Sequence, residues 1–167
     1  MADYQAHIKQ AKKNLTILSG ISKQIDQSWD WQVTCCYYVA VHLMNAHIAK
    51  TANLHYKTHE KVKTSLYSPT SSCKIPDDIY TAYIKLENLS RRARYLCHDD
   101  PSNALDGSRP FFTYDKHLKK AIQQLDKLLA YFTNSYYENF GITEINCIEI
   151  QGLTLLSFRY KQVVFAA

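Results

Sequence analysis

Hydrophobic residues recur at three- and four-residue spacing over most of the chain, which predicts amphipathic helices. The first such stripe runs from Tyr4 to Leu18 and predicts a helix from about Asp3 to Ser19. Gly20 is its expected end, because glycine adopts the left-handed conformation without a Cβ penalty. From Trp31 to Ile48 the chain is apolar almost all round. This pattern is typical of a central helix with neighbours on several sides.

Three further helices are predicted downstream. Thr58 can cap a short helix that reaches Tyr67. Pro76 suits the first turn of a fourth helix, which we expect to end near His98 because a proline follows closely. The clearest stripe of all predicts a long amphipathic helix over Tyr114 to Tyr137.

The pattern changes after Gly141. Two apolar or alternating segments, Ile145 to Ile150 and Leu155 to Phe165, flank Gln151-Gly152 and predict a terminal β-hairpin. The expected fold is therefore mainly α, an antiparallel bundle of four to five helices with a small C-terminal hairpin. We expect residues 1–140 to form the bundle and residues 141–167 to form an extension packed on the same domain.

Composition narrows the class of protein. The chain has 167 residues, of which 46% are hydrophobic and 21% charged, and only 4 Gly and 4 Pro, so a collagen-like or disordered polypeptide is excluded. No apolar run is long enough for a membrane span, and the first residues lack a secretory signal, so a cytoplasmic protein without a membrane partner is expected. The 5 cysteines lack the spacing of disulfides or of a zinc site. The net charge of +5 permits phosphate-rich partners, and the 13 tyrosines favour an oligomer.

The fourth predicted helix carries a candidate site. Helical spacing places Arg91, Arg94 and His98 on one face over roughly 10 Å, while Arg92 points elsewhere. Two guanidiniums and an imidazole can bind a phosphodiester and exchange its protons. The alternative is an ordinary solvated helix face with an ion pair between Glu87 and Arg91.

Other polar residues have simpler interpretations. His42, Asn45 and His47 interrupt the apolar central helix, and either open into a cleft or form hydrogen bonds that fix the helix against a neighbour. His55 and His59 have the spacing of a two-histidine metal pair, but no second helical histidine follows His59-Glu60, so no metal is expected. The chain has neither a phosphate-binding glycine loop nor a nucleophile elbow, and no cofactor is expected.

The central and fourth helices together resemble a known family. The stretch from Trp29 to Ala46, with its Trp-rich entry and Tyr-Tyr-x-Ala-x-His core, resembles the core helix of HEPN-domain proteins. The stretch from Ser90 to Tyr95, which leads to His98, resembles the Arg…His motif of the ribonuclease members of that family. The resemblance covers about Tyr4 to Tyr137.

The resemblance implies a small helical bundle, commonly a homodimer, and a metal-independent endoribonuclease of toxin or antiviral type. RNA would be cleaved by attack of the ribose 2′-OH on the adjacent phosphate. Catalysis would fall to Arg91, Arg92 and His98, and RNA binding to Arg94 and Tyr95. Some members are paired with a nucleotidyltransferase-type antitoxin, which is a candidate partner here.

Two alternatives remain open at this point. A non-catalytic HEPN module would bind a protein or nucleotide partner as a homodimer through the same face. A purely structural homodimer would not need Arg91 or His98 at all.

Overall fold

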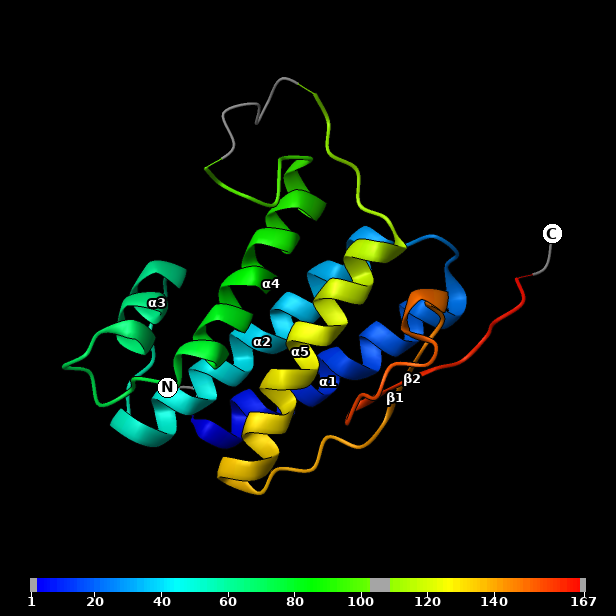
Figure 1. Ribbon diagram of the computed structural model, residues 1–167. Helices are drawn as coiled ribbons and strands as arrows, with labels where there is room; N and C mark the ends of the chain where they lie inside the picture. The colour runs from blue at the N-terminus through cyan, green and yellow to red at the C-terminus, as the bar shows by residue number, and fades with distance from the viewer. Residues whose placement is uncertain (1–2, 103–108, 166–167) are drawn as a thin grey trace.

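The computed structural model describes residues 3–102 and 109–165. The long helices run alternately in opposite directions around one core, a short helix lies to one side, and a short C-terminal segment with two strands lies beside the bundle (Figure 1). The elements follow in the order α1 (Tyr4–Gln24), α2 (Trp29–Ala52), α3 (His59–Tyr67), α4 (Asp77–Tyr95), α5 (Asp115–Tyr136), β1 (Thr143–Ile145), a single 3₁₀ turn (Ile148–Ile150) and β2 (Phe158–Tyr160). The prediction of a mainly helical fold is confirmed.

Helix α2 is the centre of the bundle and packs against α1, α4 and α5. Both ends of α2 contact neighbouring helices. Lys50 lies over the ring of Tyr4 at the start of α1, and Trp29 contacts Tyr114 just before α5. The helix extends beyond the predicted bounds at both ends and closes on Asn53 in the left-handed conformation. Eight of its hydrophobic residues are fully buried: Val33, Cys36, Val39, Ala40, Leu43, Met44, Ala46 and Ile48.

Helix α1 does not end before Gly20, and that prediction is wrong. The helix continues to Gln24 and buries Ser22 on its last turn. The C-terminal segment packs there: the Ser19 hydroxyl donates to the Glu144 carbonyl, and the Ser22 hydroxyl accepts from the Asn146 N–H at 2.8 Å. This contact between distant parts of the chain favours one more helical turn over a glycine end.

The remaining helices agree well with the pattern of the sequence. The Thr58 side chain caps α3 by accepting from the Lys61 N–H, as predicted. The stripe of α5 is buried from Leu118 to Phe132. Helix α4 begins after Pro76 but ends at Tyr95, three residues before the predicted end. That difference decides the position of His98.

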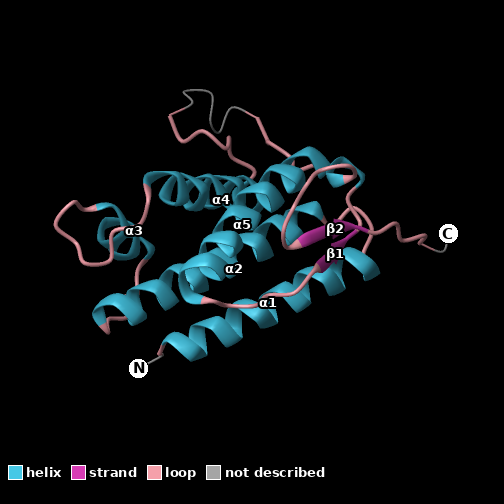
Figure 2. Ribbon diagram, turned by 60° about the horizontal axis from the view of Figure 1, so that its bottom comes forward, coloured by secondary structure: helices cyan, strands magenta, loops and turns pink. Residues whose placement is uncertain are grey.

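The C-terminal segment is not a hairpin. Strands β1 and β2 pair in parallel, with Thr143 opposite Phe158 and Ile145 opposite Tyr160. Residues 148–150, predicted as strand, form the 3₁₀ turn of the connection. Parallel neighbours need a crossover rather than a two-residue turn, and the connection here packs against the first turns of α5, where Glu149 pairs with Lys119. The segment lies on the opposite side of the bundle from α3 (Figure 2).

A buried carboxylate fixes this segment to the bundle. Asp126 on α5 accepts the N–H groups of Leu156 and Ser157 at 3.0 and 2.8 Å. These donors would otherwise lack partners at the entry to β2, because the short sheet ends there. Extension and bundle therefore share one core, to which Ile145 and Phe158 contribute.

Candidate functional site

The end of α4 separates the predicted site residues. Leu96 adopts the left-handed conformation, with φ of 55°, and its N–H closes the last helical turn on the Arg92 carbonyl. The Leu96 carbonyl then accepts the Phe111 N–H at 2.8 Å, which ties the start of the following loop to its end. His98 therefore leaves the helix. The prediction that Arg91, Arg94 and His98 share one helical face is wrong.

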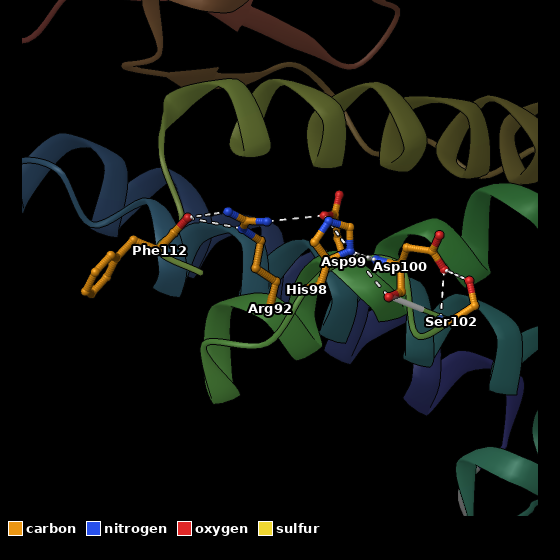
Figure 3. Close-up of polar contacts among 6 residues, drawn as sticks. All are labelled: Arg92, His98, Asp99, Asp100, Ser102 and Phe112. Atoms are coloured by element: carbon orange, nitrogen blue, oxygen red, sulfur yellow. Dashed lines mark hydrogen bonds and ion pairs between the residues drawn. The ribbon is translucent and has the colours of Figure 1, made fainter. Parts of the chain in front are cut away.

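Arg92 holds that loop against the bundle. Its Nε and Nη2 donate to the Phe112 carbonyl at 3.1 and 2.9 Å, and its Nη1 donates to Asp99 Oδ1 at 3.2 Å. Its guanidinium also lies 5.5 Å from the centre of the Phe111 ring. Figure 3 shows the guanidinium between the Phe112 carbonyl and the Asp99 carboxylate. Arg92 is buried, so these bonds form away from bulk water and position the loop.

His98 lies beside the same Asp99 oxygen that Arg92 contacts (Figure 3). Its Nδ1 is 3.9 Å from Asp99 Oδ1 and accepts the Asp100 N–H at 2.9 Å. The edge of its ring meets Phe111 at a centroid distance of 5.0 Å. Asp99 thus brings Arg92 and His98 together, although no helical face does.

The turn after His98 is held by its own side chains. Asp100 Oδ1 accepts the hydroxyl of Ser102 at 2.7 Å and its N–H at 2.9 Å. These two hydrogen bonds, the hydroxyl first, lower the pKa of Asp100 because they stabilise its charged form. The turn thereby orients the Asp100 N–H that binds His98.

The other two arginines point to different surfaces. Arg91 lines a groove between α3 and α4, together with Lys63 and Glu87. Glu87 does not pair with Arg91, as the solvated-face interpretation expected, but with Lys63 at 3.1 Å. Arg94 lies over the ring of its neighbour Tyr95, at 5.0 Å, and donates to the Tyr95 hydroxyl at 3.3 Å.

Two residues of this region have contacts that were not predicted from the sequence. Asp99 follows His98 directly in the chain, but its ion pair with Arg92 was not foreseen. His117, in the first turn of α5, is buried and accepts the Tyr114 N–H through Nδ1 at 2.9 Å. Burial, and next the nearby charge of Arg92, lower the pKa of His117 to about 4. The only local signal for His117 was its place at the third position of a helix, where a side chain can cap the N-terminus.

A second polar cluster joins three other histidines. His7 Nδ1 lies 3.2 Å from His42 Nδ1, and His7 Nε2 lies 3.1 Å from His55 Nδ1. Burial, and next the neighbouring His42, lower the pKa of His7 to about 4. His7 presents a different nitrogen to each partner, so the three rings do not converge on one point. Within residues 3–102 and 109–165, no group of three or more His, Cys, Asp or Glu is arranged to hold a metal ion.

The other histidines of the central region are structural. His47 contacts the Tyr136 hydroxyl through Nδ1 at 2.6 Å and the Cys73 carbonyl through Nε2 at 3.0 Å, so it fixes α2 against two neighbours. His59 Nδ1 lies 3.2 Å from the Tyr37 hydroxyl. His55 and His59 therefore bind different partners.

Comparison with known proteins gives no match to a family model, to a curated protein or to a solved structure. The resemblance to HEPN proteins accordingly stays a prediction. None of the described helices combines the length and the apolar character that a membrane crossing requires.

Proposed function

We propose that the chain is a HEPN-like, metal-independent endoribonuclease that acts in the cytoplasm as a homodimer. One observation supports this proposal above the others: Asp99 brings the buried Arg92 and the half-exposed His98 to one carboxylate, although they lie in different structural elements. Proton transfer requires a held imidazole, and the Asp100 N–H and the Phe111 ring hold this one. RNA is the substrate, and a nucleotidyltransferase-type antitoxin is a candidate partner.

The three arginines have different roles in this function. Arg92 is a positioning residue, because its N–H groups already bind Phe112 and Asp99. Arg91 and Arg94 point to different surfaces, so they bind different phosphates of the RNA backbone, and neither forms an ion pair with a carboxylate among the described residues. His98 transfers the protons. The ribose 2′-oxygen bonds to phosphorus, the bond to the 5′-oxygen breaks, and the proton lost by the 2′-OH is balanced by one delivered to the 5′-oxygen.

Cleavage of RNA in the presence of EDTA tests this function. Wild-type protein is incubated with a mixed pool of single-stranded RNA, beside His98→Ala and a control variant, His59→Gln, which removes an imidazole at the start of α3 and keeps a side chain able to bind the Tyr37 hydroxyl. We expect wild type and the control to produce ends with a 2′,3′-cyclic phosphate, and His98→Ala to lose at least a hundredfold in rate, as removal of an acid–base group does. DNA of the same sequence should stay intact. Equal cleavage by His98→Ala would refute the role of His98.

A second candidate is the non-catalytic binding module. The hydrogen bonds of Arg92 to other protein groups favour this candidate, because the buried guanidinium of the motif then has a structural task. In that case wild-type protein does not cleave RNA, and His98→Ala weakens partner binding or stability, as measured by sedimentation and by thermal unfolding. The cleavage assay therefore separates the two candidates.

A further inference from the structure

Three large aromatic side chains are exposed on α2 and α4, two helices that pack against each other. Trp31 and Tyr38 on α2 are 65% and 42% exposed, and Tyr95 at the end of α4 is 66% exposed. Trp31 and Tyr38 are seven residues apart, so they lie on one face of α2, roughly 10 Å from each other along the axis. Rings of this size are normally buried in a core or an interface. Their exposure together needs an explanation.

Arg94 connects the two helices on this surface. Its guanidinium lies 5.0 Å from the centre of the Tyr95 ring and 5.9 Å from the centre of the Tyr37 ring. Tyr37 in turn contacts Tyr38, at a centroid distance of 6.0 Å. The Arg94 Nε donates to the Ser90 carbonyl at 3.3 Å, which holds the guanidinium in place between the rings. We call Trp31, Tyr38, Arg94 and Tyr95 the aromatic surface.

The charge on this surface favours an anionic ligand. Arg94 is exposed, and its contacts with described residues are to tyrosine rings, a hydroxyl and a carbonyl rather than to a carboxylate. Its positive charge therefore stays available to a phosphate group. Flat rings around a single guanidinium are the arrangement by which proteins bind unpaired bases and the phosphates between them.

We propose that the aromatic surface binds the unpaired bases of single-stranded RNA. Bases stack on Trp31, Tyr38 and Tyr95, and Arg94 binds the backbone. Because the two rings of α2 lie farther apart than the roughly 3.4 Å between stacked bases, a strand must be unstacked to reach both. Bases inside a duplex stack on each other and present no face to a side chain. The surface therefore selects single strands. This inference rests on the proposed function for its choice of RNA.

Binding measurements in a background that cannot cleave test the inference. His98→Ala protein is titrated with a fluorescein-labelled single-stranded RNA and with its duplex, and fluorescence anisotropy is recorded. Trp31→Ala and Tyr95→Ala are each added to that background. Tyr137→Ala serves as the matched control, because Tyr137 is an exposed tyrosine at the far end of α5.

We expect Trp31→Ala and Tyr95→Ala each to weaken binding of the single strand between about fivefold and a hundredfold, the range that loss of one stacked base gives. Trp31→Phe should recover most of this loss, because it restores a ring. Tyr137→Ala should bind like its parent. Arg94→Ala should weaken binding and lower the slope of log affinity against log salt by about one.

Two results would overturn the inference. One is equal binding of the single strand by Trp31→Ala, Tyr95→Ala and the Tyr137→Ala control. The other is equal affinity of the parent for the duplex and the single strand. A shift of the oligomeric state by Trp31→Ala with unchanged RNA binding would instead assign the surface to a second copy of the chain, which also overturns it.

Failure of this inference differs from failure of the proposed function. If wild type cleaves RNA and the aromatic variants bind it normally, only the aromatic surface is refuted. If wild type does not cleave RNA, yet binds single strands through Trp31 and Tyr95, the surface is supported and the nuclease is refuted.

Discussion

Arg92 offers the sharpest test of how the candidate site is built. Replacement by methionine keeps most of the length of the side chain and removes every hydrogen bond of the guanidinium. The bonds lost are those to the Phe112 carbonyl, at 2.9 and 3.1 Å, and to Asp99, at 3.2 Å. Arg91→Met is the matched control, because Arg91 is the adjacent arginine on the same helix and lines an open groove.

The magnitude follows from burial and from the number of acceptors. Hydrogen bonds of charged groups contribute about 1.5 to 3 kcal/mol each. The two N–H groups that share the Phe112 oxygen count as one such bond. Asp99 keeps 28% of its side-chain surface in water, so it remains partly hydrated after the change. We expect Arg92→Met to lower the free energy of unfolding by about 3 kcal/mol, which corresponds to a fall in Tm of about 6 to 12 °C for a chain of this size.

Urea unfolding followed by circular dichroism measures this loss, at neutral pH and with both variants in parallel. Arg91→Met should lose less than about 0.5 kcal/mol, as surface substitutions do. Arg92→Lys should recover only part of the loss, because an ammonium cannot present the planar, two-pronged set of donors. A loss below about 1 kcal/mol for Arg92→Met, or equal losses for both methionine variants, would refute the positioning role of Arg92.

Two further predictions concern stability. Burial lowers the pKa of both His7 and His117 to about 4 in the folded state, while the unfolded side chains titrate near 6.5. The unfolded chain thus binds more protons between these values, so the free energy of unfolding should fall, on the order of 2 kcal/mol per histidine, as the pH decreases from about 6.5 to about 4. Urea unfolding over this range checks the effect, and a pH dependence that His7→Gln leaves unchanged would contradict it. Asp126→Ala should lower the free energy of unfolding by about 3 kcal/mol, because two N–H groups of the C-terminal segment lose a charged acceptor. Hydrogen exchange should be faster at the Ser157 N–H. Unchanged protection there would show that Asp126 does not hold the segment.

The positions of the helices were largely predictable from the local pattern of hydrophobic and polar residues. The stripe of α5 and the Thr58 cap of α3 required only residues within a few turns of each other. Periodicity reports which face of a helix is buried, and that face is set by neighbours in sequence. The predicted end of α1 was wrong because a distant contact decided it: Ser22 on the last turn of the helix binds Asn146, more than a hundred residues later.

The candidate site was predictable as a set of residues but not as an arrangement. The Arg-rich end of α4 and His98 stood out by composition and by their resemblance to a known motif. Which arginine shares a carboxylate with His98 depended on where α4 ended. The hydrogen bond from the Phe111 N–H to the Leu96 carbonyl, which joins the two ends of the following loop, contributes to that helix end. Helical spacing favoured Arg91 and Arg94, whereas Asp99 selected Arg92.

The sequence by itself determined a mainly helical chain, the central place of α2 and the residues from which a site could be built. The tertiary structure alone decided that the terminal strands run parallel, that His98 leaves the helix and that Arg92 is buried against Phe112. The physical reason is the range of the interactions. Helices arise from hydrogen bonds four residues apart and from one apolar face, which the sequence displays directly. Strand direction, helix ends and buried ion pairs depend on which distant groups meet, and only packing settles that.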